Sequence, residues 1–221
     1  MSTGEPGRPG CFISFEGLDG SGKTTQVERL ARRLRELGRD VVVAVEPGGT
    51  AIGEQVRQIL LDAANRALAP ETELLLYFAS RAQNVVEVIR PALARGAVVL
   101  ADRFTDSTVA YQGYGRGLGE QAVLQLHGIA CGDLTPDLTI LLDVDPEIGL
   151  ARVQGRGRPN RMDEQTREFY RRVREAYLGL ARKQERRFRV VDAGAGLETV
   201  AAAIWELVAP ALGLAPGKSS T

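Results

Sequence analysis

Short apolar runs alternate along this chain with longer segments in which apolar residues recur every three or four positions. The short runs are rich in β-branched residues, which is typical of buried strands, and the longer segments have helical periodicity. The predicted strands are Cys11–Glu16, Val41–Val45, Ala97–Ala101, Leu138–Leu142 and Phe188–Val191. The predicted helices are Thr25–Leu37, Ile52–Ala63, Glu71–Ala94, Glu120–Cys131, Pro146–Val153, Asp163–Arg186 and Leu197–Leu212.

The order of these elements indicates an α/β fold in one domain. Apolar strands separated by helices predict a five-stranded parallel sheet with helices on both faces. Right-handed crossovers then place connecting loops at the carboxyl ends of the strands, where we expect the functional residues. The domain is expected at residues 11–213 of 221, because residues 1–10 and 214–221 are rich in Gly, Pro and Ser and predict disordered tails.

Net charge, apolar runs and cysteine content limit the kinds of partner and compartment that fit this protein. The formal net charge is zero, so there is no overall basic field for nucleic acid, and no apolar run is long enough to predict a membrane span. Cys11 and Cys131 are far apart and are interpreted as small buried hydrophobes. Because no secretory signal pattern is present either, we expect a cytoplasmic protein. No motif pairs His127 with another catalytic or metal-binding residue, so we assign it no functional role.

A phosphate-binding pattern follows the first strand. The segment Gly17-Leu-Asp-Gly-Ser-Gly-Lys-Thr24 has the form GxxxxGK[ST] and lies where a strand is predicted to turn into a helix. Glycines let successive backbone N–H groups converge on a polyphosphate, and the helix N-terminus adds partial positive charge. Lys23 is expected to reach the β- and γ-phosphates and Thr24 to ligate Mg²⁺. The alternative is a glycine-rich turn without function. The predicted ATP-binding residues here are Gly17, Leu18, Asp19, Gly20, Ser21, Gly22, Lys23, Thr24 and Thr25.

Two rival classes of P-loop protein fit the sequence poorly. Guanine recognition by a GTPase needs a lysine-containing loop, and no lysine lies between Lys23 and Lys183. A large motor or transporter ATPase needs a longer chain. In a small-molecule kinase, Asp102 at the end of the third strand can organise Mg²⁺ and its water, and Arg103 can bind an acceptor phosphate with two parallel hydrogen bonds. The alternative for this pair is a surface ion pair at a strand end.

Four blocks of sequence, in this order, resemble thymidylate kinases, and the bacterial branch fits best. The blocks are Glu16-Gly-Leu-Asp-Gly-Ser-Gly-Lys-Thr24, Glu46-Pro-Gly-Gly-Thr50, Asp102-Arg-Phe-Thr-Asp-Ser-Thr-Val-Ala-Tyr-Gln-Gly113 and Pro136-Asp-Leu-Thr139. The resemblance implies a P-loop fold, Mg²⁺ as cofactor, transfer of the γ-phosphoryl group of ATP to dTMP for dTTP biosynthesis, and a homodimer. One departure is Val45, where the bacterial branch commonly has an arginine.

The resemblance also implies roles in binding the acceptor. Tyr77 would stack on the thymine ring, Arg81 would bind its edge, and Tyr111 would lie where a ribose 2′-hydroxyl would clash. From spacing alone, the favoured interpretation of Tyr77 and Arg81 is a packed aromatic residue and a solvated base, and only the resemblance reverses it. A helix-surface charge is a close alternative for Arg57. The acceptor-binding residues so implied are Asp19, Glu46, Pro47, Arg57, Tyr77, Arg81, Arg103, Ser107, Thr108, Tyr111 and Gln112.

Four arginines between residues 152 and 161 predict a basic lid at about residues 152–162. Because Leu18 to Ser21 include no arginine, charge on the transferring phosphoryl group must be stabilised from elsewhere, and the resemblance is to the type with catalytic arginines in the lid. Arg156 is the first candidate for the catalytic role, followed by Arg152, Arg158 and Arg161, and Arg161 is also assigned to ATP binding. Alternatives are a solvated loop or a nucleic-acid patch. For the whole protein, the alternatives are a kinase for another nucleotide and a regulatory module that binds nucleotide without catalysis.

Overall fold

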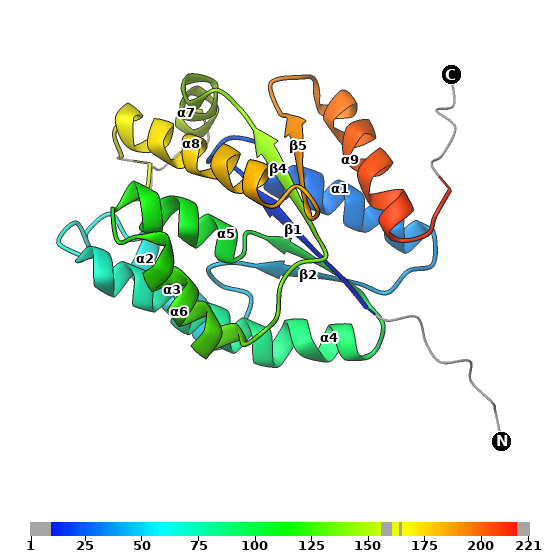
Figure 1. Cartoon of the computed structure of the whole chain (residues 1–221), viewed down its shortest axis with the longest axis horizontal. Helices are drawn as coiled ribbons and strands as arrows, with labels where there is room; N and C mark the ends of the chain where they lie inside the picture. The colour runs from blue at the N-terminus through cyan, green and yellow to red at the C-terminus, as the bar shows by residue number, and fades with distance from the viewer. Residues whose placement is uncertain (1–9, 156–160, 164, 216–221) are drawn as a thin grey trace.

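The computed structural model describes residues 10–155, 161–163 and 165–215, and these residues form a five-stranded, all-parallel sheet. The strand order is β2-β3-β1-β4-β5 (Figure 1). The strands are β1 (Cys11–Glu16), β2 (Val41–Val45), β3 (Val98–Asp102), β4 (Leu138–Asp143) and β5 (Phe188–Asp192). All five predicted strands are confirmed to within about one residue at each end, because continuous β-branched runs mark strands buried on both faces.

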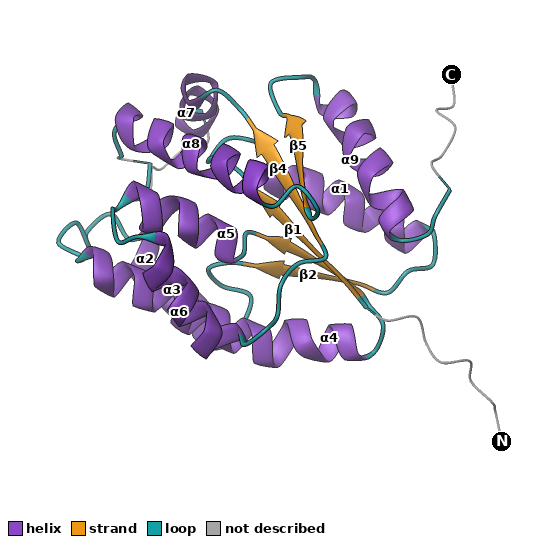
Figure 2. Cartoon of the chain, in the orientation of Figure 1, coloured by secondary structure: helices purple, strands orange, loops and turns teal. Residues whose placement is uncertain are grey.

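Helices cover both faces of the sheet (Figure 2). Their bounds are α1 (Lys23–Glu36), α2 (Ala51–Leu61), α3 (Pro70–Asn84), η1 (Val85–Ile89), α4 (Arg90–Ala94), α5 (Thr105–Thr108), η2 (Val109–Gly115), α6 (Glu120–Cys131), α7 (Pro146–Gln154), α8 (Arg167–Lys183) and α9 (Leu197–Ala211). Helices α1 and α9 contact each other and pack on one face, and α4, η1 and α8 lie against the other.

Side chains alternate between the two faces of the central strands. Ile13 and Phe15 of β1 belong to one apolar core, whereas Phe12 belongs to a second core on the opposite face. Cys131 is buried in the second core, in agreement with its interpretation as a small buried hydrophobe, whereas Cys11 is only partly buried and packs against the first core. The cores hold the carboxyl ends of β1 and β3 side by side, with Phe15 in register with Asp102.

Two helical predictions differ from the structure. The helix predicted at Glu71–Ala94 is a continuous run that passes through the π-helical segment η1, where the N–H of Arg90 bonds to the carbonyl of Val85, five residues earlier. Pro91 follows directly and has no N–H to donate, which favours a local change of hydrogen-bond pattern. Helix α8 begins at Arg167 instead of Asp163, because the Thr166 hydroxyl accepts from the N–H of Phe169 and caps the helix.

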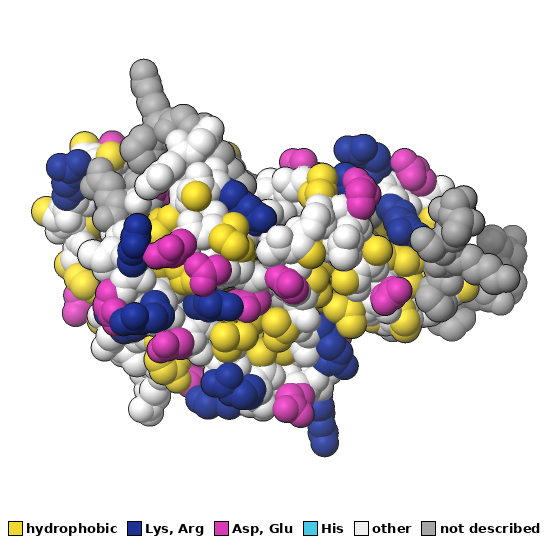
Figure 3. Space-filling view, turned by 90° about the horizontal axis from the view of Figure 1, so that it is seen from above, with side chains coloured by type: hydrophobic (Ala, Val, Ile, Leu, Met, Phe, Trp, Pro, Cys, Tyr) yellow, Lys and Arg dark blue, Asp and Glu magenta, His cyan; other side chains and the backbone are white. Residues whose placement is uncertain are grey.

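The carboxyl-terminal boundary also differs. Leu214, which the composition placed in a tail, donates its N–H to the carbonyl of Ala209 at 2.8 Å and packs against the main core. The other residues of the predicted tails, apart from Gly10 and Ala215, lie outside the described residues. In the described part of the chain, no helix is both long and apolar enough to cross a membrane. On the face shown in Figure 3, basic and acidic side chains are interspersed.

Candidate active site

The loop between β1 and α1 has the backbone conformation that the glycine pattern predicts. Gly20 has φ 79° and Gly22, the N-cap of α1, has φ 91°. Residues with a side chain rarely adopt such positive φ values. A Cβ on Gly20 would lie 2.2 Å from the carbonyl oxygen of Gly149 in α7. The loop is therefore packed closely between the sheet and α7, and it delivers the amino end of a 14-residue helix to the carboxyl edge of the sheet.

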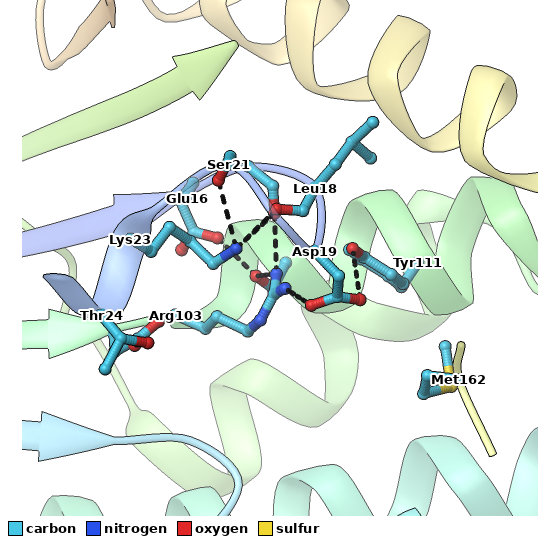
Figure 4. A network of polar contacts seen from close by, with 12 residues as sticks. Glu16, Leu18, Asp19, Ser21, Lys23, Thr24, Arg103, Tyr111 and Met162 are labelled. Carbon is cyan, nitrogen blue, oxygen red and sulfur yellow. Dashed lines mark hydrogen bonds and ion pairs between the residues drawn. The ribbon is translucent and has the colours of Figure 1, made fainter. Parts of the chain in front are cut away.

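Lys23 folds back over this loop (Figure 4). Its Nζ donates to the carbonyl oxygens of Gly17 at 3.1 Å and Leu18 at 2.8 Å, and lies 3.4 Å from Ser21 Oγ. Burial, and then the charge of Arg103, lower the pKa of Lys23 to about 8. The ammonium group is thus held beside the loop by carbonyl groups that a bound polyphosphate can replace.

Thr24 and Asp102 meet at the end of β3. Thr24 Oγ1 donates to Asp102 Oδ2 at 2.6 Å, and Thr24 lies in the first turn of α1. No cluster of three or more acidic, His or Cys residues that could hold a metal exists among the described residues. A hydroxyl and one carboxylate suit Mg²⁺, which keeps several waters and is usually bound with substrate phosphates. These two residues therefore fit the predicted metal site.

Arg103 has a backbone conformation that is rare for a residue with a side chain. Its φ is 77°, in the left-handed region. Its own N–H donates to the carbonyl oxygen of Phe15 at 3.0 Å, and the N–H of Phe104 donates to Glu16 Oε1 at 2.8 Å. These bonds hold the turn in place, and strain of this kind is concentrated at functional sites.

The guanidinium of Arg103 joins the phosphate-binding loop to α5. It donates to Asp19 Oδ1 at 2.5 Å, to the carbonyl oxygen of Gly17 at 2.9 Å and to Ser107 Oγ at 3.1 Å. Burial alone would raise the pKa of Asp19, but the charges of Arg103 and Lys23 lower it below its ordinary value. Asp19 therefore remains a carboxylate between the two predicted substrate sites.

Glu16, the last residue of β1, lies buried beneath Arg103. Its Oε2 accepts from Ser107 Oγ at 2.5 Å and from the Tyr177 hydroxyl at 3.2 Å. Burial, and then the charge of Asp106, raise the pKa of Glu16 to about 8. The sequence motif includes Glu16 but gives it no role, and sequence reasoning missed Tyr177. The signal for Glu16 was an acid at the carboxyl end of an apolar strand.

One cavity opens on the other side of Arg103, between α3 and η2. All eleven predicted acceptor-binding residues line it, together with Leu61 and Met162, which the sequence did not suggest. Arg57 reaches the rim, where its Nη1 donates to the carbonyl oxygen of Pro47 at 2.6 Å. The Tyr111 hydroxyl donates to Asp19 Oδ2 at 3.3 Å. Three of the four sequence blocks, at residues 16–24, 46–50 and 102–113, thus contribute to a single cavity.

A buried ion pair lies in the wall of this cavity. Arg81 Nε donates to Glu46 Oε2 at 2.5 Å, and Arg81 Nη2 donates to Thr108 Oγ1 at 2.9 Å. Two buried atoms of the pair, Arg81 Nη1 and Glu46 Oε1, have no hydrogen-bond partner among the described residues. Unsatisfied buried polar atoms are costly, so this wall is suited to a polar ligand. Tyr77 lies nearby, and burial raises its pKa to about 12, which keeps its hydroxyl neutral.

The predicted lid residues are placed differently from one another. Arg152 Nη1 donates to the carbonyl oxygens of Gly20 at 3.3 Å and Ala193 at 3.1 Å, so it lies against the phosphate-binding loop. Arg156 and Arg158 lie outside the described residues. Arg161, which the sequence assigned to ATP, is instead only 5% exposed and pairs with Glu73 Oε2 at 2.6 Å.

The position of Arg161 has a physical cause. Glu73 is a buried carboxylate on α3 that requires cations, and Arg161 Nε also donates to the carbonyl oxygen of Leu60 at 2.9 Å. Sequence reasoning missed Glu73. The signal was its spacing, because residues 73, 77 and 81 recur every four positions and share the helix face that lines the cavity.

Comparisons with known proteins identify the family of the chain. Residues 15–204 match the model of the thymidylate kinase family. The chain is 51% identical over 205 residues to the thymidylate kinase of Geobacter sulfurreducens, covering 90% of this chain and 96% of that protein. It is 52% identical over 195 residues to that of Ectopseudomonas mendocina, covering 88% and 93%.

A solved structure agrees as well. The crystal structure of thymidylate kinase from Ehrlichia chaffeensis superposes with a TM-score of 0.74 at 36% identity, covering 92% of this chain and 99% of that one. Family, fold and sequence identity over nearly the whole length therefore converge, and the chain belongs to the thymidylate kinase family as a dTMP kinase, a phosphotransferase of nucleotide biosynthesis.

Proposed function

We propose that ATP binds at the loop of residues 17–25 with Mg²⁺, and that its γ-phosphoryl group passes directly to the phosphate of dTMP held in the cavity between α3 and η2. The observation that carries this proposal is the position of Arg103. It lines the cavity and also contacts Asp19 and the carbonyl oxygen of Gly17 in the phosphate-binding loop. One guanidinium can therefore seat the acceptor phosphate beside the donor, as in-line transfer requires.

On the donor side, Lys23 exchanges the carbonyl oxygens of Gly17 and Leu18 for phosphate oxygens. Thr24 and Asp102 would hold Mg²⁺, which when bound neutralises charge on the phosphate oxygens. The protein otherwise contributes orientation. The loop's backbone N–H groups and the amino end of α1 hold the phosphates, and Asp102 keeps Thr24 Oγ1 in place.

On the acceptor side, the base is recognised at the Arg81–Glu46 wall. A thymine carbonyl oxygen is the partner that the unsatisfied Arg81 Nη1 lacks. Tyr77 is positioned to stack on the ring, while Thr108 and Gln112 lie along its edge. Tyr111 and Asp19, joined by their hydrogen bond, lie on the sugar side, where Tyr111 leaves no space for a ribose 2′-hydroxyl.

Arginines of the lid supply the further positive charge that stabilises the transferring phosphoryl group, as in the bacterial type of the family. Leu18 to Ser21 contain no arginine, and Arg152 already lies against Gly20. Arg156, four residues farther along the chain, is our choice for the residue that reaches the transferring group. Such an arginine contributes about 10³-fold or more to turnover.

A homodimer is supported by apolar side chains that the single chain leaves exposed. Helices α3 and α6 lie side by side (Figure 1), and Leu75, Val86, Leu124 and Ile129 on α3, η1 and α6 are 50–83% exposed. Exposed apolar residues gathered on neighbouring helices mark interaction surfaces. Sedimentation over a range of concentrations tests this, and Ile129→Glu is expected to shift the protein to monomer without loss of folding.

The substrate assignment is tested by steady-state assays of ADP release with ATP, Mg²⁺ and a panel of acceptors. We expect turnover of dTMP to exceed that of dCMP and of thymidine by orders of magnitude. Rapid turnover of dCMP or thymidine with dTMP inert would point to the kinase for another nucleotide. Tight binding of ATP with no transfer to any monophosphate would favour the regulatory module.

A further inference from the structure

Glu73 is the centre of a buried polar network at the base end of the cavity. It is 1% exposed and accepts from three side chains. Gln112 Nε2 donates to its Oε1 at 2.7 Å, Arg116 donates to both carboxylate oxygens at 3.1 Å, and Arg161 Nη1 lies 2.6 Å from its Oε2. None of the roles assigned above uses this carboxylate.

The two arginines keep Glu73 charged and in place. Each has a second anchor: Arg116 Nη1 donates to Gln165 Oε1 at 2.7 Å, and Arg161 Nε donates to the carbonyl oxygen of Leu60 at 2.9 Å. Burial would raise the pKa of Glu73, but the hydrogen bonds from Arg116 and Gln112 lower it below its ordinary value. Glu73 is therefore an ionised carboxylate, which has acceptor atoms only.

An acceptor-only neighbour determines which way the Gln112 amide faces. The amide can offer either its NH₂ group or its oxygen to a neighbour, and only the NH₂ group can bond to Glu73. With Nε2 bound to Glu73, the other end of the amide, Oε1, is directed away from the carboxylate. Gln112 lines the cavity, so the group it offers to a base edge is a hydrogen-bond acceptor.

We propose that Glu73 is a positioning residue for base selection, acting through the orientation of the Gln112 amide. The proposal rests on the function proposed above, in which Gln112 reads the base. Thymine presents a donor at N3–H, which matches a fixed acceptor oxygen. Cytosine presents an unprotonated N3, which faces that oxygen without a hydrogen bond, so the fixed amide disfavours dCMP.

The test is Glu73→Gln, with Glu71→Gln on the exposed side of the same helix as the matched control. Gln at position 73 can donate or accept, so the Gln112 amide is free to turn and bond to cytosine N3. The ratio of kcat/KM for dTMP to that for dCMP is expected to fall about tenfold or more in Glu73→Gln and to stay unchanged in Glu71→Gln. An unchanged ratio in Glu73→Gln, with the thermal midpoint retained, overturns the proposal.

Gln112→Ala separates this proposal from the proposed function. If Gln112→Ala retains the wild-type ratio, Gln112 does not read the base, so the role proposed for Glu73 and the base-reading role of Gln112 both fail, while phosphoryl transfer to dTMP is unaffected. If the ratio of kcat/KM for dTMP to that for dCMP falls in Gln112→Ala but keeps its wild-type value in Glu73→Gln, only the role of Glu73 fails. Glu73→Gln made in the Gln112→Ala background is expected to leave the ratio of the single Gln112→Ala variant unchanged.

A measurement on the unaltered protein covers the case in which Glu73→Gln does not fold. The side-chain NH₂ protons of Gln112, assigned in NMR spectra by their loss in Gln112→Ala, are expected to exchange with solvent at least about tenfold more slowly than those of an exposed glutamine. Exchange at the rate of an exposed glutamine would show that the amide is not held by Glu73 and would overturn the proposal.

Discussion

Arg103 and Asp19 form an ion pair of 2.5 Å across the boundary between the phosphate-binding loop and the acceptor cavity. Arg103 follows β3, whereas Asp19 lies in the loop that follows β1, and the two strands are neighbours in the sheet. Because the guanidinium also contacts Ser107 and the carbonyl oxygen of Gly17, its position is determined from three sides. Donor and acceptor geometry thus depend on one side chain.

Replacement of Arg103 by lysine is expected to lower kcat/KM for dTMP by about 100-fold, which corresponds to about 3 kcal/mol. Lysine keeps the charge but cannot bond in parallel to Asp19 and to a phosphate, because it lacks the planar arrangement of donors. Steady-state kinetics measures this. Arg95→Lys, at a half-exposed ion pair with Asp40, is the control and should retain wild-type kinetics. Equal kinetics in the two variants would contradict the role of Arg103.

The buried Arg81–Glu46 pair predicts a large loss of stability when one partner is removed. Arg81→Met leaves the Glu46 carboxylate in a buried site without its cation, which is expected to lower the free energy of unfolding by about 3–5 kcal/mol. In Arg81→Met/Glu46→Gln the buried charge is gone, so part of this loss should be recovered. Urea unfolding of both variants measures the difference, and a double variant at least as unstable as the single one would contradict the argument.

The strands and the acceptor cavity could be predicted because each depends on a local pattern. Continuous apolar runs marked β1 to β5. The sequence motifs supplied eight residues that the structure gathers around one cavity, and the family resemblance added Arg57, Tyr77 and Arg81. The sheet explains why separate motifs meet. Parallel strands end at the same edge, so the segments after β1, β2 and β3 lie together.

Arg161 could not be placed in the same way. Its partner Glu73 is 88 residues earlier in the chain, and a cluster of four arginines gives no information on which distant carboxylate each one pairs with. Burial of both charges in one network depends on tertiary packing, which local periodicity does not describe. The π-helical segment before Pro91, in contrast, had a visible signal, because proline inside a long helical pattern disturbs the hydrogen-bond ladder.

Thr24 predicts a difference between two conservative substitutions. Thr24→Ser retains the hydroxyl that bonds to Asp102, whereas Thr24→Val retains the shape and loses it. We expect Thr24→Val to need about tenfold or more Mg²⁺ for half-maximal activity, and Thr24→Ser to resemble wild type. Titration of the initial rate with Mg²⁺ at saturating nucleotide measures this. Identical Mg²⁺ dependence in both variants would remove Thr24 from the metal site.

The two lid arginines are expected to differ in kinetics. Arg156→Gln should lower kcat by about 10³-fold with little change in KM for dTMP, because an interaction made only in the transition state is lost. Arg152→Gln removes bonds to Gly20 and Ala193 beside the phosphate-binding loop, so it should also raise KM for ATP. Single-turnover measurements separate the two effects. A normal kcat in Arg156→Gln would move the catalytic role to another lid arginine.

Glu16 predicts a pH dependence of stability. Its pKa is raised to about 8 in the folded protein, from an ordinary value of 4.5. Between these two values the folded state holds a proton that the unfolded state has released, so the contribution of Glu16 to stability is present below about pH 4.5 and is lost as the pH rises through about 8. Glu16→Gln is neutral at every pH and lacks this dependence. Urea unfolding measured at a series of pH values from 5 to 8 tests this. The free energy of unfolding of wild type should fall relative to that of Glu16→Gln as the pH rises. Glu28→Gln, a substitution at an exposed residue, is the control and should follow wild type. A constant difference between wild type and Glu16→Gln across this range would mean that Glu16 is already ionised in the folded protein.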